Sequence, residues 1–149
     1  MKLLTAQDVI DTVGSEFSLN AKQWVAFRII AEFFMAKYVE KRLPEEEQLR
    51  MLMMGPGGTG KTHVVKAVQR VMEHYGCAHL IRFLAPTGSA AALINGMTVH
   101  KGLGIKIKSK NRGKGNHNVG AMAEDYSFIL LDEVSLVGLQ LLAEIDHTL

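Results

Sequence analysis

The residues from Gly55 to Thr62 have the types and spacing that bind a phosphate group. They read GPGGTGKT, which fits the pattern of glycine, four residues, glycine, lysine and serine or threonine. Glycines let backbone N–H groups surround a phosphate, and a helix that starts here directs its N-terminal N–H groups at the same oxygens. Lys61 would supply a positive charge to the β- and γ-phosphates, and the Thr62 hydroxyl would hold Mg²⁺. The segment therefore predicts a site for a nucleoside triphosphate.

A pair of adjacent carboxylates, Asp132 and Glu133, follows the apolar run from Ser127 to Leu131. Ligands of open α/β sheets bind at the carboxyl ends of the strands, where this pair would lie. Asp132 is then placed to hold Mg²⁺ through its water shell, and Glu133 to polarise the attacking water. A strand end followed by a helix start is the plain alternative, and the phosphate loop upstream favours the catalytic interpretation.

Three other places carry polar groups whose role the residues alone leave open. Thr87, in the stretch APTGSAA, either caps the helix that follows or grips a nucleic-acid phosphate with its hydroxyl and the amides after it. The triplet Thr98–Val99–His100 is ambiguous in the same way, since an isolated histidine is often only a surface residue. Gln23 either reads an adenine edge or completes a capping box with Asn20.

The elements that position these groups follow from hydrophobic periodicity. An amphipathic helix is predicted from Asn20 to about Leu43, ended by Pro44. Beyond it the chain alternates strands and helices, which predicts a parallel, doubly wound α/β sheet. We expect buried strands at 49–54, 79–85 and 127–131, and helices at 62–75, 88–95 and from about Ser135 to Leu149, with Gly76 as a C-terminal cap.

Composition narrows the class of protein. The chain has 149 residues, of which 48% are hydrophobic and 21% charged, as in an ordinary globular domain. Charges interrupt every apolar run before it reaches the roughly 18 residues of a membrane helix. Cys77 is the one cysteine, which excludes an intrachain disulfide and a cysteine-rich zinc site. We expect a soluble, intracellular chain.

The net charge of +2 is unevenly distributed. Six of the 17 Lys and Arg residues lie between Lys101 and Gly120, a segment without Asp or Glu. A basic segment on an otherwise acidic body suggests a phosphate-rich partner, and a solvated loop is the simpler alternative. The segment also lacks the aromatic residues that stack on single-stranded nucleic acid.

The order of these motifs resembles the start of one enzyme family. The chain resembles the Pif-type DNA helicases, which are superfamily-one, RecD-like motor enzymes, and the similar helicases of transposable elements. The motifs that carry the resemblance are LNAKQ at 19–23, GPGGTGKT at 55–62, APTGSAA at 85–91, TVH at 98–100 and LLDEVS at 130–135. The resemblance covers nearly all of the chain from about Leu19. The phosphate loop is common to many ATPases, whereas the later motifs are more specific.

The resemblance implies a RecA-like P-loop NTPase lobe with a parallel sheet, apparently truncated after the strand that carries the acidic pair. It implies an ATPase that moves five-prime to three-prime on single-stranded DNA and separates duplex DNA, in DNA repair, recombination or replication, with ATP and Mg²⁺ as cofactors and the nucleus as location. The implied ATP contacts are Gln23, Gly57, Gly58, Thr59, Gly60, Lys61 and Thr62, with Thr62 and Asp132 on Mg²⁺ and Lys61 and Glu133 catalytic. The implied DNA contacts are Pro86, Thr87, Gly88, Ser89, Thr98 and His100.

Two departures from the family qualify these expectations. Leu136 stands where the family usually has methionine, a tolerable exchange of similar size. The family's second RecA-like lobe, with the arginines that stabilise the transferring phosphate, does not follow the acidic pair, so we expect residues 1–149 alone to hydrolyse ATP very poorly. We expect an N-terminal helical region at 1–43 and a partial ATP-binding domain at 44–149. Another P-loop ATPase, a nucleotide kinase and an inactive remnant that binds ATP or DNA weakly remain alternatives.

Overall fold

The computed structural model describes residues 3–55, 60–104 and 127–149, and its chain forms two compact units, Met1–Ala78 and His79–Leu149. The secondary-structure elements described in the first unit are helices, and the second unit contains a three-stranded parallel sheet. The mixed α/β class with a parallel sheet is therefore confirmed, while the division at residues 43 and 44 stays a prediction. No helix in these three ranges is long and apolar enough to cross a membrane.

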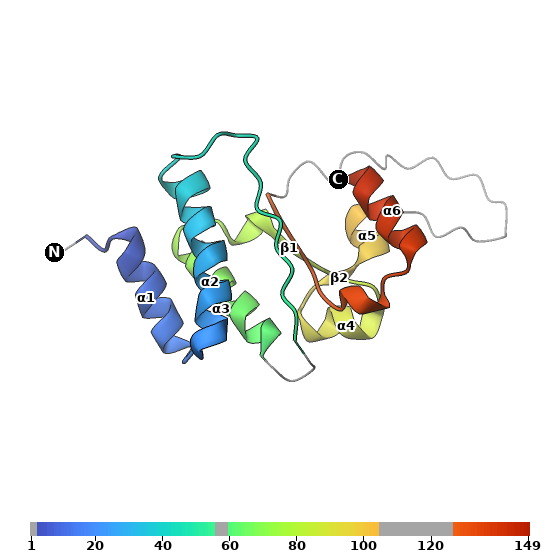
Figure 1. Cartoon of the computed structure of the whole chain (residues 1–149), viewed down its shortest axis with the longest axis horizontal. Coiled ribbons are helices and arrows are strands. Elements are labelled where there is room, and N and C mark those ends of the chain that lie inside the picture. The colour runs from blue at the N-terminus through green and yellow to red at the C-terminus, as the bar shows by residue number, and fades with distance from the viewer. Residues whose placement is uncertain (1–2, 56–59, 105–126) are drawn as a thin grey trace. The chain divides into compact units, whose positions relative to one another are not determined.

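The first unit is built on three α-helices, α1 (Ala6–Glu16), α2 (Ala21–Phe34) and α3 (Lys61–His74) (Figure 1). Each turns an apolar stripe inward. The buried side chains of the three are Val9, Ile10, Val13, Phe27, Ala31, Phe34, Val64, Val65, Ala67, Val68, Val71 and Met72. Gly14 lets α1 approach α2 closely, because a Cβ there would lie 2.2 Å from the Cη2 atom of Trp24.

The predicted start of α2 is confirmed, and its predicted end is wrong. Asn20 is the N-cap, and its side chain and that of Gln23 exchange hydrogen bonds with each other's backbone N–H groups at 2.9 Å. The α-helix ends at Phe34 and continues as a π-helical turn, η1 (Met35–Val39), so the helical segment stops short of Leu43. Proline limits only the residue before it, and the chain leaves the helix earlier than that limit requires.

The C-terminal cap predicted for α3 is confirmed. Gly76 adopts a left-handed conformation with φ +69°. Its N–H donates to the Glu73 carbonyl at 3.0 Å, and the N–H of Cys77 donates to the Met72 carbonyl at 2.8 Å. These two bonds satisfy carbonyls that the helix end would otherwise leave unpaired.

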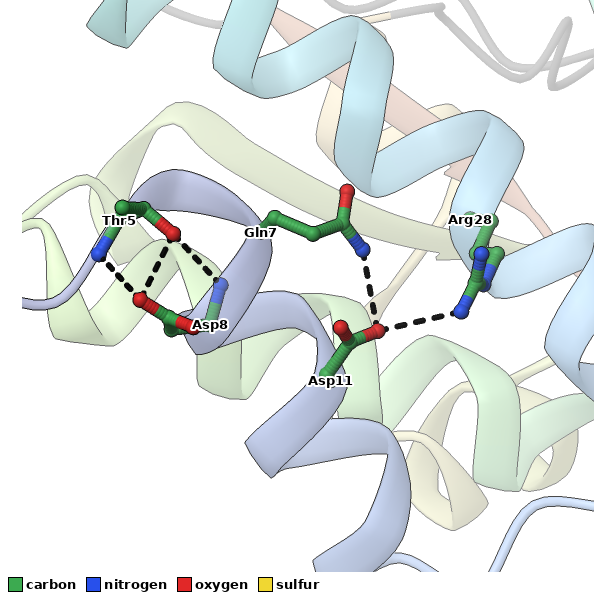
Figure 2. Close-up of polar contacts among 5 residues, drawn as sticks. All are labelled: Thr5, Gln7, Asp8, Asp11 and Arg28. Atoms are coloured by element: carbon green, nitrogen blue, oxygen red, sulfur yellow. Dashed lines mark hydrogen bonds and ion pairs between the residues drawn. The ribbon is translucent and has the colours of Figure 1, made fainter.

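A capping box and an ion pair fix α1, as Figure 2 shows. The Thr5 hydroxyl and backbone N–H donate to an Asp8 carboxylate oxygen at 2.7 and 2.8 Å, and the Asp8 N–H donates to the Thr5 hydroxyl at 3.2 Å. One turn later, Asp11 accepts from Gln7 at 3.0 Å and pairs with Arg28 of α2 at 3.1 Å. The guanidinium of Arg28 also lies over the ring of Trp24, with Cζ 5.1 Å from the ring centroid.

The capping box predicts a pH dependence of stability. The hydrogen bonds from the Thr5 hydroxyl and backbone lower the pKa of Asp8 below its ordinary value of 3.8. A lowered folded-state pKa stabilises the fold above the unfolded-state pKa, and this contribution disappears as pH falls through the folded-state value. We expect Asp8→Asn to unfold at lower urea concentration than wild type at pH 7, and the difference to shrink below about pH 4. A difference that is constant from pH 7 to pH 2.5 would contradict this expectation.

The strand predicted at 49–54 is wrong. The structure assigns no strand to this segment, and it leaves the side chains of Leu52 and Met54 67% and 84% exposed. A β-strand requires a neighbouring strand to complete its hydrogen bonds. The other elements described in the first unit are helices, so they offer this apolar run no such neighbour.

The sheet of the second unit has the order β2–β1–β3, with all neighbours parallel. Its strands are β1 (Ile81–Ala85), β2 (Met97–Thr98) and β3 (Phe128–Leu131). β1 begins two residues later than predicted, because a 3-10 turn, η2 (Ala78–Leu80), precedes it. In the register, Ala85 lies beside Thr98 and Leu84 beside Leu131, so β1 is the central strand.

Helices α4 (Gly88–Leu93), α5 (Val99–Leu103) and α6 (Leu139–Thr148) belong to the same unit (Figure 1). Its core joins Leu84, Val99, Leu103 and Ile145, against which Leu131, Val137 and Leu141 pack. β3 was expected to be buried, but it is only half-buried and Ile129 is 38% exposed. The last helix begins at Leu139 rather than near Ser135, because residues 134–136 form a 3-10 turn, η3.

Candidate nucleotide and nucleic-acid sites

The described end of the phosphate loop has the conformation that its sequence predicts. Gly60 is left-handed with φ +78°, and α3 starts at the next residue. Among the described residues no side chain caps this helix, so its N-terminal N–H groups and positive dipole end point toward the loop. The Lys61 ammonium donates to the carbonyl of Gly55 at 2.7 Å, across the two ends of the loop. Gly57, Gly58 and Thr59 lie outside the described residues.

Gln23 contacts the phosphate loop. Its Oε1 accepts from the Asn20 N–H, while its Nε2 donates to the Gly60 carbonyl at 3.4 Å. A Cβ on Gly60 would lie 2.3 Å from that nitrogen. The capping-box interpretation of Gln23 is thus confirmed, and the structure brings this side chain to the loop that was expected to hold the triphosphate. Its contact with adenine stays a prediction.

The contact between Gln23 and Gly60 predicts a coupling between two substitutions. Gly60→Ala should cost about 2 kcal/mol of unfolding free energy, in part from the left-handed φ and in part from overlap with the Gln23 amide. In a Gln23→Ala background the overlap is absent, so the same change should cost about 1 kcal/mol. Urea unfolding of the four proteins measures this. Gly88→Ala is the control, because a Cβ there meets nothing within 4 Å. Equal costs in the two backgrounds would contradict the coupling.

The structure adds a contact that the sequence analysis missed. The Nε2 of His63, in the first turn of α3, lies 2.5 Å from the Phe17 carbonyl, and the two rings are 5.2 Å apart. Phe17 is the C-cap residue of α1. Phe17, at the end of α1, and Gln23, in the first turn of α2, therefore both contact the start of α3. No sequence signal identifies a contact between residues 46 positions apart.

Three motifs meet at the carboxyl edge of the sheet in the second unit. The stretch Pro86–Ser89 follows β1, Thr98 ends β2, and Asp132 follows β3. The strands are parallel, and the N–H of Asp132 donates to the Leu84 carbonyl at 2.8 Å. Residues that are distant in sequence thus share the edge at which open α/β sheets bind ligands.

The two threonines at this edge are helix caps. Thr87 Oγ1 accepts from the Ala90 N–H at 3.2 Å, and Thr98 Oγ1 accepts from the Lys101 N–H at 3.3 Å. The capping alternative is therefore confirmed for both. A hydroxyl that accepts in this way still has its own hydrogen to donate. Gly88 and Ser89 are exposed, while Pro86 and His100 are half-buried.

The acidic pair has a constrained backbone. Glu133 has φ +53°, a left-handed conformation that is uncommon for a residue with a side chain. Its N–H donates to Asp132 Oδ1 at 3.0 Å, and its own side chain is exposed. Three other described residues, Ser18, Lys41 and Asn95, have a similar positive φ, so this conformation does not by itself mark a site. Asp132 is half-buried and Glu133 is exposed, and their roles as metal ligand and water-activating base stay predictions.

The Mg²⁺ site expected from Thr62 and Asp132 stays a prediction. In the three described ranges, no group of three or more His, Cys, Asp and Glu side chains could hold a metal on its own. Mg²⁺ prefers hard oxygen ligands and usually combines one or two protein groups with water and phosphate oxygens. The Thr62 hydroxyl and the Asp132 carboxylate are oxygen donors of that kind. Thr62 belongs to the first unit and Asp132 to the second.

A phosphate loop that opens a helix, together with carboxylates at the carboxyl edge of a parallel sheet, defines the class of P-loop NTPases. The family model described as "AAA domain" matches residues 37–148. The chain belongs to this family, and its fold is that of a RecA-like P-loop lobe.

Two curated relatives match parts of the chain. The ATP-dependent DNA helicase PIF3 of Trypanosoma brucei brucei is 31% identical over 91 residues, which are 61% of this chain and 11% of the relative. An uncharacterized protein of Methanocaldococcus jannaschii is 24% identical over 112 residues, which are 66% of this chain and 10% of the relative. No solved structure matches. The resemblance to Pif-type helicases is confirmed, and the match spans about a tenth of each relative's length.

Proposed function

We propose that this chain is the ATP-binding portion of a DNA helicase that moves five-prime to three-prime and acts in DNA repair, recombination or replication. The observation that carries the proposal is the meeting of Pro86–Ser89, Thr98 and Asp132 at one edge of the sheet. A similar segment in an ATP-dependent DNA helicase supports it. The nucleus as its location, which the family resemblance implies, is part of the proposal.

The phosphate loop binds the triphosphate of ATP in this proposal. The N-terminal N–H groups of α3 and the ammonium of Lys61 neutralise the phosphate oxygens. The hydrogen bond from Lys61 to the Gly55 carbonyl is exchanged for one to a phosphate, which is the stronger acceptor because it is charged. Thr62 and Asp132 would hold Mg²⁺, which would withdraw charge from the phosphate that is transferred.

Glu133 acts on water. Its carboxylate is exposed and follows Asp132 directly, so it can accept a proton from a water molecule that attacks the γ-phosphate. The left-handed backbone at Glu133 directs this side chain differently from that of Asp132. The two carboxylates can therefore serve two roles.

Base stacking in duplex DNA averages about 1.4 kcal/mol per step, so strand separation needs the energy of ATP hydrolysis.

A single DNA strand binds at this edge of the sheet in the proposal. Its phosphates contact Thr87, Ser89, Thr98 and His100, with Pro86 and Gly88 beside them. The threonine hydroxyls are fixed by their capping bonds, and each donates its remaining hydrogen to a phosphate oxygen. Because the capping bonds already fix these side chains, DNA binding costs no further side-chain conformational entropy at these threonines. The two interpretations of these threonines are thus compatible, because accepting and donating use different parts of one hydroxyl.

Salt dependence of DNA binding tests the proposal. We expect labelled single-stranded DNA to bind the chain, with an affinity that falls steeply as salt rises. The basic segment from Lys101 to Lys114 lies mostly outside the described residues. If it contacts phosphates, Lys106→Gln, Lys108→Gln and Lys110→Gln together should reduce the slope of log K against log salt by about 2.

Fluorescence anisotropy at several salt concentrations measures both quantities. Lys22→Gln, Lys41→Gln and Lys66→Gln in one protein, all at exposed positions of the first unit, form a control with the same charge change. If the three substitutions leave the slope unchanged, the segment does not contact DNA phosphates and is only a solvated loop. Absence of DNA binding by the wild-type chain would contradict the helicase proposal, and phosphoryl transfer to a nucleotide would favour a kinase.

A further inference from the structure

Arg82 is a buried charged residue in the centre of the sheet. Its side chain, on β1, is only 9% exposed, and no other charged residue in the described ranges is buried. Burial lowers the pKa of its guanidinium below the ordinary value, although an arginine stays charged in proteins. A buried charge is costly unless it is paired or hydrogen-bonded. Its presence on the central strand therefore calls for a specific partner.

That partner includes α5. The Nη1 of Arg82 donates to the carbonyl of Gly102 at 2.7 Å, a short and charge-assisted hydrogen bond. Gly102 is the last residue but one of α5, and carbonyls at a helix end have no N–H donor within the helix. The guanidinium thus ties the end of a five-residue helix to the central strand. Such a short helix is not stable by itself and depends on contacts of this kind.

The packing around Gly102 fixes the position of α5 closely. A Cβ on Gly102 would lie 2.2 Å from Cδ2 of Leu84 and 3.7 Å from Cδ of Arg82. Arg82 and Leu84 are two residues apart on β1, so they share one face of the sheet. The buried Val99 and Leu103 of α5 complete the contact. Backbone, apolar side chains and one guanidinium together leave α5 little freedom to shift.

The same helix carries two of the expected DNA contacts. Thr98 is its N-cap, and His100 is its second residue. We propose that Arg82 is a positioning residue, which holds α5 on β1 so that Thr98 and His100 face a DNA strand in a fixed arrangement. This inference rests on the proposed function, since it gives Arg82 its role through DNA contacts. Arg82 itself touches no substrate.

Three variants of the full chain test it. Arg82→Met removes the donors and keeps an apolar side chain, whereas Arg82→Lys keeps a charge and a donor. Gly102→Ala pushes α5 away from Leu84 and leaves the guanidinium in place. Arg70→Met, at an exposed arginine of α3, is the matched control. The readouts are the Kd for labelled single-stranded DNA, the Kd for Mg-ATP, and hydrogen exchange of residues 98–104.

We expect Arg82→Met and Gly102→Ala to raise the Kd for DNA about tenfold and Arg82→Lys about threefold. Exchange should accelerate at 98–104 and stay unchanged in β1 and β3, while Mg-ATP affinity stays within twofold. If Arg82→Met fails to fold, the other two variants decide. Wild-type DNA affinity in the two variants that decide would overturn the inference: Arg82→Met and Gly102→Ala, or Arg82→Lys and Gly102→Ala if Arg82→Met does not fold. Accelerated exchange throughout the second unit would also overturn it. A wild-type chain that binds no DNA would instead overturn the proposed function together with this role.

Discussion

Lys61→Ala is expected to weaken binding of Mg-ATP by at least about 100-fold, which corresponds to about 2.7 kcal/mol. The ammonium group lies at the start of α3 and donates to the carbonyl of Gly55, so it is already directed across the loop. Removing one partner of a close charge pair costs several kcal/mol, since the phosphate oxygens then lose a charged donor. Fluorescence of a labelled ATP analogue measures the Kd.

The control for this prediction is Lys66→Ala. Lys66 lies on the same helix and its side chain is exposed, so its substitution removes an equal charge away from the loop. Its Kd should stay within twofold of wild type, and both variants should unfold cooperatively without nucleotide. Equal ATP affinity of wild type and Lys61→Ala would mean that the loop does not hold the phosphates.

Thr87→Asp combined with Thr98→Asp is expected to reduce affinity for single-stranded DNA by at least about 100-fold while the fold is retained. Aspartate is as good an N-cap as threonine, so α4 and α5 keep their capping bonds. Its negative charge, however, repels the DNA phosphates. The double substitution therefore separates the capping role of these residues from the DNA-binding role.

The neutral control is Thr87→Asn with Thr98→Asn, because asparagine caps a helix without a charge. We expect it to lose less than tenfold in DNA affinity. Circular dichroism with thermal melting confirms that both double variants fold. If the two aspartates leave DNA affinity unchanged, the threonines are caps and nothing more, and the DNA strand does not pass this edge of the sheet.

The local features of the fold could be predicted from the sequence because short-range chemistry determines them. Asn20 with Gln23 at the start of α2 and Gly76 after α3 form the cap structures that their residue types favour. α1 was not predicted as a separate helix within the helical region expected at 1–43, although Thr5 and Asp8 have the spacing of a capping box. A weaker signal of the same kind was therefore present in the sequence.

The errors concern elements that depend on distant partners. Residues 49–54 have the composition of a buried strand, but strand formation requires a neighbour that composition does not specify. β3 reads as a fully apolar run, and yet its burial depends on what covers each face of the sheet. The start of α6 shifted to Leu139 because residues 134–136 use a tighter turn.

The candidate site shows the same division. The rule that ligands bind at the carboxyl ends of parallel strands predicted the place of Asp132. β2 was not predicted, so it is the structure that brings Thr98 to the same edge as Thr87 and Asp132. The hydrogen bonds of His63 to Phe17 and of Arg82 to Gly102 could not be predicted, since they join residues 46 and 20 positions apart through side-chain reach. Sequence patterns identify motif residues, and the structure is needed to find the residues that hold them.

Calorimetric titration of Mg-ATP into the wild-type chain tests the central claim most directly. The claim is that the loop ending in Lys61 and Thr62 binds a nucleoside triphosphate with its metal. We predict heat of binding with one ATP per chain, loss of most of the signal when EDTA removes Mg²⁺, and a rise in melting temperature with nucleotide. A cooperatively folded chain that gives no heat and no shift in melting at millimolar Mg-ATP would contradict the account.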